Sequence, residues 1–91
     1  MSIKTDPTRV VMYASKYCIF CMRAKQLLNA KTDKLSIINT DGNAKLRAEL
    51  KSKTGSRTVP QIWVGNTYVG GCDDLYQLER SGELTPLLEQ L

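Results

Sequence analysis

Cys18 and Cys21 are the residues of this 91-residue chain best suited to chemistry, because two residues separate them. In a reducing compartment this spacing is typical of thiol–disulfide exchange or of a metal site. Zinc needs a tetrahedral set of ligands, usually Cys and His, but the remaining cysteine is Cys72 and the sequence contains no histidine. The lack of histidine also excludes Cys–His and Ser–His catalysis. We therefore favour a redox pair that binds no metal over zinc ligation, and over two inert cysteines of a core.

A helix is expected to start at Cys18, directly after a strand, and this position favours a reactive thiolate. The first backbone N–H groups of a helix have no intrahelical partner and carry the positive end of the helix dipole, so they stabilise S⁻ over SH. Lys16 and Arg23 add positive charge nearby. Cys18 is the outer residue, and Cys21 lies one turn further in. We predict that Cys18 is the nucleophile and that Cys21 resolves the mixed disulfide that Cys18 forms.

The elements that must position these cysteines follow the order strand, helix, strand, helix, two strands, helix, helix. Apolar and β-branched runs predict the strands, and Gly65-Asn66 predicts a hairpin turn. Residues 44–53 also alternate with period two, but they are strong helix formers, so a helix is favoured there. The expected strands are 9–14, 35–39, 61–64 and 67–69; the expected helices start at 18, 44, 72 and 85, and the first three end at 29–34, Gly55 and Ser81-Gly82.

The helices carry further local signals that the structure can test. Asn43 is a candidate cap for the second helix, and Pro86 is expected at the first position of the last one. Apolar residues predict one buried face on the first helix and one on the last. These faces are Phe20, Ala24, Leu27 and Leu28, with Cys21 on the adjoining stripe, and Leu84, Leu87, Leu88 and Leu91.

The element order defines an α/β fold class. Two strands joined by a helix should be parallel, and a hairpin adds antiparallel partners. The result is a four-stranded mixed sheet with helices on both faces, which resembles the thioredoxin-like layout. We expect a single domain over residues 1–91.

Two motifs in the second half of the chain offer backbone groups to a ligand. Arg57-Thr58-Val59-Pro60 precedes a strand, and a cis Val59–Pro60 bond would present the Val59 N–H and C=O, although most prolines are trans. Gly70-Gly71-Cys72-Asp73-Asp74 combines glycines with a helix start, which provides N–H donors for a carboxylate and acids for an ammonium group. An ordinary helix cap explains the second motif equally well when it is taken alone.

Together, the Cys18–Cys21 motif, the segment 57–60 and the segment 70–75 resemble the glutaredoxins over residues 9–91. The resemblance implies a thioredoxin fold, glutathione as cosubstrate, and reduction of protein disulfides and glutathione mixed disulfides. It implies that Val59 pairs its backbone with the cysteinyl part of glutathione ahead of a cis Pro60, and that the Asp73/Asp74 pair receives the ammonium group. The residues implied to bind glutathione are Lys16, Phe20, Arg47, Thr58, Val59, Pro60, Gly71, Cys72, Asp73 and Asp74. Of these, Arg47 and Lys16 would meet the glycyl carboxylate, and the backbone amides of Cys72 and Asp73 the γ-glutamyl carboxylate.

The sequence departs from the pattern of the family at the active site. Ile19-Phe20 replaces the usual Pro-Tyr, which should alter the redox potential, and Lys16 stands one position closer to Cys18 than the usual basic residue. Cluster-bearing members of the family often lack the same proline. A [2Fe-2S] dimer held by two Cys18 thiolates and two glutathiones is therefore one alternative, and a redoxin reduced by thioredoxin reductase is another.

Charge is distributed unevenly along the chain. The net charge is +4, with +8 on residues 1–57 and −4 on residues 58–91. This separation fits a ligand such as glutathione, with two carboxylates and one ammonium group. The basic residues lack interleaved aromatics, so no nucleic-acid partner is expected, and no segment suggests a secretory signal or a membrane span. We expect a cytoplasmic monomer that acts on glutathionylated or disulfide-bearing proteins and depends indirectly on glutathione reductase.

Overall fold

A mixed four-stranded sheet forms the centre of the computed structural model, which describes residues 3–91. Its strands are β1 (Val10–Ala14), β2 (Leu35–Asn39), β3 (Gln61–Val64) and β4 (Thr67–Gly70), in the order β2-β1-β3-β4. β1 pairs in parallel with β2 and antiparallel with β3, and β3 pairs antiparallel with β4. The predicted fold class is confirmed.

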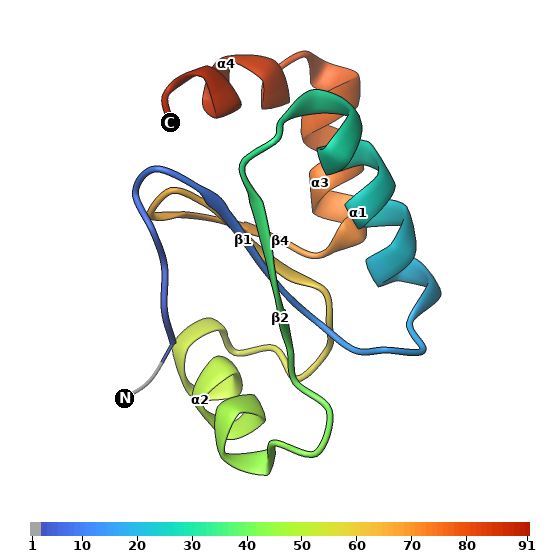
Figure 1. Ribbon diagram of the computed structural model, residues 1–91, viewed down its shortest axis with the longest axis vertical. Helices are drawn as coiled ribbons and strands as arrows, with labels where there is room; N and C mark the ends of the chain where they lie inside the picture. The colour runs from blue at the N-terminus through green and yellow to red at the C-terminus, as the bar shows by residue number, and fades with distance from the viewer. Residues whose placement is uncertain (1–2) are drawn as a thin grey trace.

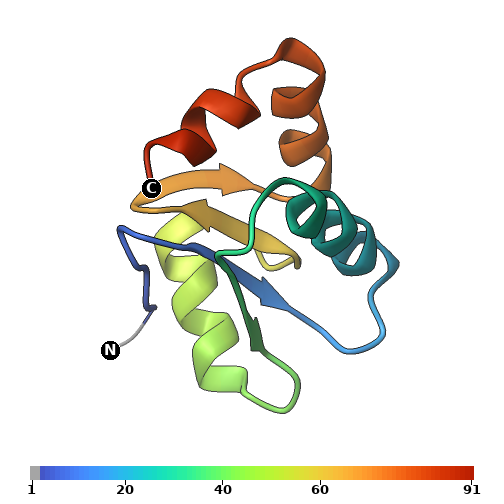
Figure 2. The same cartoon turned by 45° about the horizontal axis from the view of Figure 1, so that its top comes forward.

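Helices cover both faces of this sheet (Figures 1 and 2). α1 (Ile19–Lys31), α3 (Cys72–Ser81) and α4 (Leu84–Glu89) lie on one face, and α2 (Ala44–Thr54) lies on the other. Among residues 3–91, no helix combines the length and the apolar character that crossing a bilayer would require.

The alternation of side chains along β1 divides the core into two layers. Val10, Met12 and Ala14 pack with the buried residues of α1, α3 and α4, whereas Val11 and Tyr13 face α2 and pack with Leu50 and Trp63. All residues of β1 are buried, which accounts for its continuous apolar sequence. The C-terminal end of β1 is thereby fixed, and it leads directly to the cysteines.

Most of the predicted helix ends are confirmed. The Asn43 side chain accepts a hydrogen bond from the Leu46 N–H at 3.0 Å and caps α2. Gly55 ends α2 in the left-handed region at φ 80°, where glycine is favoured. α1 continues through Asn29 and ends at Lys31, within the polar stretch that predicted its end.

Two predictions about helix positions are wrong. Pro86 is the third residue of α4, not the first, because the chain leaves α3 at Gly82 and buries Leu84 as the first residue of α4. A proline is tolerated there because the N–H groups of the first turn have no intrahelical partner. Phe20 is 50% exposed, because the buried face of α1 is centred on the side of Cys21 and Leu28 and Phe20 lies at the edge of that face. The buried face consists of Cys21, Ala24 and Leu28.

Candidate functional site

Cys18 is itself the N-cap of α1. Its backbone is extended (φ −128°, ψ 110°), and its Sγ accepts a hydrogen bond from the Cys21 N–H at 3.2 Å. Sulfur thus occupies the position that a Ser or Asp oxygen takes in most N-caps. The sulfur faces the positive end of the helix dipole, where a negative charge is stabilised. This geometry, together with its partial exposure, makes Cys18 the accessible sulfur of the pair.

Cys21 has the opposite environment. Its side chain is 4% exposed and belongs to the core between the sheet, α1 and α3. The pKa of Cys21 is raised from 9.0 to about 12, mainly by burial and to a smaller extent by the hydrogen bond with Cys18. A hydrogen bond from the Ser15 backbone opposes this shift. Cys21 is therefore a thiol at neutral pH, which leaves Cys18 as the sulfur able to act as a nucleophile.

The loop before β3 lies against the Cys18 sulfur. The Val59–Pro60 peptide bond is cis, as the resemblance implies, and the Cys18 Sγ is 3.8 Å from the Val59 carbonyl oxygen. The buried Gln61 side chain holds this loop, since its Nε2 donates to the Ser56 and Thr58 carbonyls at 2.9 and 3.0 Å. The Val59 backbone is thus held beside the reactive sulfur.

A groove of about 550 Å³ extends from this loop to the N-terminus of α3. It contains most of the residues that the resemblance implied for glutathione, although Lys16 and Arg47 do not line it. Its acidic residues, Asp73 and Asp74, lie at the N-terminus of α3. The lining residues are Phe20, Ser56, Thr58, Val59, Pro60, Tyr68, Val69, Gly70, Gly71, Cys72, Asp73 and Asp74.

The two acids at the N-terminus of α3 differ in their surroundings. Asp74 Oδ2 accepts a hydrogen bond from the Gly71 N–H at 3.1 Å, so this carboxylate caps its own helix. Asp74 also packs against Gly70, whose φ of 112° and lack of a Cβ permit the contact. Asp73 is exposed in the first turn. Burial raises the pKa of the Cys72 thiol, so this third cysteine is not an activated nucleophile.

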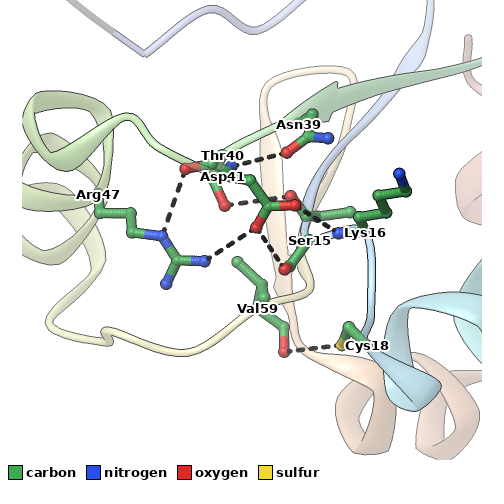
Figure 3. A network of polar contacts seen from close by, with 9 residues as sticks. Ser15, Lys16, Cys18, Asn39, Thr40, Asp41, Arg47 and Val59 are labelled. Atoms are coloured by element: carbon green, nitrogen blue, oxygen red, sulfur yellow. Dashed lines mark hydrogen bonds and ion pairs between the residues drawn. The ribbon is translucent and has the colours of Figure 1, made fainter.

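Lys16 and Arg47 belong to a separate polar network, shown in Figure 3. The Arg47 guanidinium lies 3.9 Å from Asp41 Oδ1, and its Nε donates to the Thr40 carbonyl at 3.4 Å. The backbone N–H of Lys16 donates to Asp41 Oδ2 at 2.8 Å, while its ammonium group lies 5.4 Å from the centre of the Tyr17 ring. The structure therefore brings the Arg47 guanidinium and the Lys16 backbone together at Asp41, but not the Lys16 ammonium group.

Sequence reasoning missed some of the residues that line the groove. Gly70 belongs to the motif 70–74 noted in the sequence but was not counted among the glutathione-binding residues; its φ of 112° is one that glycine adopts readily. Ser56, Tyr68 and Val69 carry no comparable signal, since their approach depends on how the hairpin packs against α3. Among residues 3–91 there is no group of three or more His, Cys, Asp and Glu side chains arranged to hold a metal ion.

Comparison with known proteins places the chain among relatives of one family. The glutaredoxin family model matches residues 10–69. A glutaredoxin of Pseudomonas aeruginosa is 57% identical over 79 residues, covering 87% of this chain and 94% of the relative. Glutaredoxin 3 of Escherichia coli is 44% identical over 80 residues, covering 88% of this chain and 96% of the relative.

Solved structures give the same result. The solution structure of glutaredoxin from Brucella melitensis matches with a TM-score of 0.81 and 43% identity, covering 90% of this chain and 89% of the other. The crystal structure of a buckwheat glutaredoxin–glutathione complex matches with a TM-score of 0.83 and 32% identity, covering 89% of this chain and 76% of the other.

The chain belongs to the glutaredoxin family. It is a glutathione-dependent thiol–disulfide oxidoreductase, the activity that defines these proteins.

Proposed function

We propose that Cys18 performs the nucleophilic step and that the groove beside it binds the glutathione part of the substrate. The observation that carries this proposal is the Cys18 sulfur, which caps α1 and lies 3.8 Å from the Val59 carbonyl at the end of the groove. The solved buckwheat relative is a complex with glutathione, which supports the choice of ligand.

For a glutathione mixed disulfide, the Cys18 thiolate attacks the glutathione sulfur. The bond between glutathione and the protein substrate breaks, the substrate leaves as a thiolate, and a Cys18–glutathione disulfide forms. The thiolate of a second glutathione then attacks the glutathione sulfur of this adduct, which regenerates the Cys18 thiolate and releases oxidised glutathione. Cys21 takes no part in this route.

For a protein disulfide, the Cys18 thiolate attacks one substrate sulfur and releases the other. Cys21 must then lose its proton and attack the Cys18 sulfur, which releases the fully reduced substrate and leaves a Cys18–Cys21 disulfide. Two glutathiones reduce this disulfide in turn. Because Cys21 is a buried thiol, its attack should be slower at neutral pH than the first attack by Cys18.

The groove fits the charges of glutathione. The N–H groups of Cys72 and Asp73 are in the first turn of α3, where they have no intrahelical partner and can donate to the γ-glutamyl carboxylate. Because the Asp74 carboxylate already accepts from Gly71, Asp73 is the acid best placed for the ammonium group. The Val59 backbone would pair with the cysteinyl part, and Arg47, with Lys16, would attract the glycyl carboxylate.

The remaining lining residues, among them Phe20, Thr58, Pro60 and Gly71, would define the shape of the groove. We propose that the protein acts as a monomer in the cytoplasm, where its three free cysteines stay reduced, and that its substrates are glutathionylated or disulfide-bearing proteins. Glutathione reductase would regenerate the glutathione that is consumed.

The test is turnover of a glutathionylated peptide and of a disulfide-bearing protein, each with glutathione, NADPH and glutathione reductase. We expect Cys18→Ser to abolish both activities, and Cys21→Ser to retain the first and lose the second. Full activity of Cys18→Ser in both assays would refute the assignment. No turnover by the wild-type protein with glutathione, but turnover with thioredoxin reductase, would instead identify the other electron donor.

A further inference from the structure

Asp41 connects two parts of the chain that meet near the active site. It follows β2, yet its carboxylate contacts the segment that follows β1 (Figure 3). Its Oδ1 accepts a hydrogen bond from the Ser15 hydroxyl at 2.6 Å, and its Oδ2 accepts one from the Lys16 N–H at 2.8 Å. One carboxylate thus holds the segment that leads from the sheet to Cys18.

Arg47 approaches the same carboxylate from α2. Its guanidinium Nη2 lies 3.9 Å from Asp41 Oδ1, and its Nε donates to the Thr40 carbonyl at 3.4 Å. Thr40 is fully buried, and its N–H and hydroxyl both donate to the Ala14 carbonyl, at 2.8 and 3.1 Å. The network is therefore anchored to the end of β1, and Arg47 and the Ser15–Lys16 segment share one fixed support.

Ser15 and Lys16 stand immediately before Tyr17 and Cys18, so their position determines where the sulfur can lie. We propose that Asp41 is a positioning residue that holds the Cys18 segment and the Arg47 guanidinium in a fixed relation. With this relation fixed, a glutathione whose sulfur meets Cys18 also has its glycyl carboxylate within the field of Arg47. This inference rests on the proposed function, because it takes Arg47 as the group that attracts the glycyl carboxylate.

The chemistry of the donors explains why a carboxylate suits this position. An ionised carboxylate only accepts hydrogen bonds, and here a hydroxyl, a backbone N–H and a guanidinium all present donors. The hydrogen bonds from Ser15 and Lys16 hold the pKa of Asp41 below its usual value, so the carboxylate stays ionised at neutral pH. The side chains of Asp41 and Arg47 are each 41% exposed, so their ion pair adds little stability by itself.

Asparagine at position 41 separates the contacts with Ser15 and Lys16 from the ion pair with Arg47. Its amide oxygen can accept from the Lys16 N–H, and its amide N–H can donate to the Ser15 hydroxyl, which can rotate to accept. The contacts to the cysteine segment are then kept. The charge that attracts Arg47 is lost, so Asp41→Asn isolates the orientation of the guanidinium.

The experiment compares kcat/KM for a glutathionylated peptide with that for the same peptide carrying glutathione whose glycyl carboxylate is amidated. The variants are Asp41→Asn, Arg47→Ala and the double variant, with Asp33→Asn as the matched control. Asp33→Asn removes an exposed carboxylate before β2, at the other end of the strand, and should leave kcat/KM unchanged. Thermal unfolding and the rate of Cys18 alkylation by iodoacetamide, each measured for every variant, check that Asp41→Asn keeps the fold and the cysteine segment.

We expect Asp41→Asn and Arg47→Ala each to lower kcat/KM for the glutathionylated peptide by about twofold to fivefold, the effect of one partly exposed ion pair. Neither should change it for the amidated substrate, and the double variant should be no worse than Arg47→Ala. The preference is the ratio of kcat/KM for the glutathionylated peptide to that for the amidated one. If Asp41→Asn leaves this ratio unchanged while Arg47→Ala abolishes the preference, the positioning role is wrong and the proposed function stands. The same holds if the losses from the two substitutions multiply in the double variant. If Arg47→Ala also leaves the preference unchanged, the assignment of Arg47 fails together with the inference, whereas the role of Cys18 does not.

Discussion

The burial of Cys21 predicts an unusual pH dependence for closure of the Cys18–Cys21 disulfide. Closure requires the Cys21 thiolate, because the thiol is not a nucleophile. In the reduced protein, the pKa of Cys21 is raised to about 12, with burial as the largest cause and the hydrogen bond with Cys18 as the second. In the Cys18–glutathione adduct the Cys18 sulfur belongs to a disulfide, so burial remains as the main cause and holds the pKa of Cys21 above its ordinary 9.0. Below its pKa, the thiolate fraction of Cys21 increases about tenfold for each pH unit.

As the pH rises from 7 to 10, closure should keep accelerating, by more than the about ninetyfold expected of a thiol with the ordinary pKa of 9.0. Such an ordinary thiol would level off above pH 9. The upper bound is about a thousandfold, the acceleration that a pKa of about 12 would give.

The assay is rapid mixing of the reduced protein with excess glutathionylated peptide, followed by acid quenching and intact mass measurement. Mass separates the Cys18–glutathione adduct from the closed disulfide, so the rate of conversion of one into the other gives the closure step. In the Cys21→Ser control, the adduct should persist at every pH. A closure rate that levels off near pH 9 would refute the reasoning from burial.

Three further predictions concern the groove and the core. Gly70→Ala places a Cβ against the Asp74 carboxylate at a backbone φ of 112°. We expect the free energy of unfolding to fall by about 1–3 kcal/mol in a denaturant titration, and kcat/KM for glutathionylated peptide to fall as well. Unchanged values for both would contradict the close packing. Leu28→Ala removes a fully buried side chain from the core and should cost about 2–5 kcal/mol in the same titration, whereas a loss below about 1 kcal/mol would mean that the core collapses around the cavity. Burial raises the pKa of Tyr13 and of Cys72 above their ordinary values of 10.0 and 9.0. As the pH rises past those values, the unfolded chain loses these protons before the folded protein does, so the free energy of unfolding should fall. A free energy of unfolding that stays constant between about pH 9 and 11 would contradict this.

The elements were largely predictable because their signals are local. The β-branched run of β1, the Gly65-Asn66 turn and the Asn43 cap each depend on residues within a few positions, and the structure places them as expected. Phe20 was misplaced because helical periodicity shows which residues share a broad face but not where the centre of the buried part lies. Pro86 was misplaced because the burial of a neighbouring leucine, not the proline, decides where α4 starts.

The features of the candidate site that depend on neighbouring residues were predictable from the sequence. The position of Cys18 at the start of a helix is a local property, and so are the glycines before α3 and the acids in its first turn. The arrangement of Lys16 and Arg47 was not visible, because both meet Asp41, which is distant from Lys16 in the sequence and has no recognisable motif. Long polar side chains take their positions from such tertiary partners, and spacing alone does not reveal them.

The central claim is that the Cys18 sulfur accepts glutathione during turnover. The most direct test is to react each of the two variants, Cys18→Ser and Cys21→Ser, with a glutathionylated peptide, and then to map the glutathione adduct by peptide mass analysis. We predict that Cys21→Ser carries glutathione on Cys18 and none on Cys72, and that Cys18→Ser carries none on any sulfur. An adduct on Cys21 or Cys72 that forms as fast without Cys18 would contradict the account.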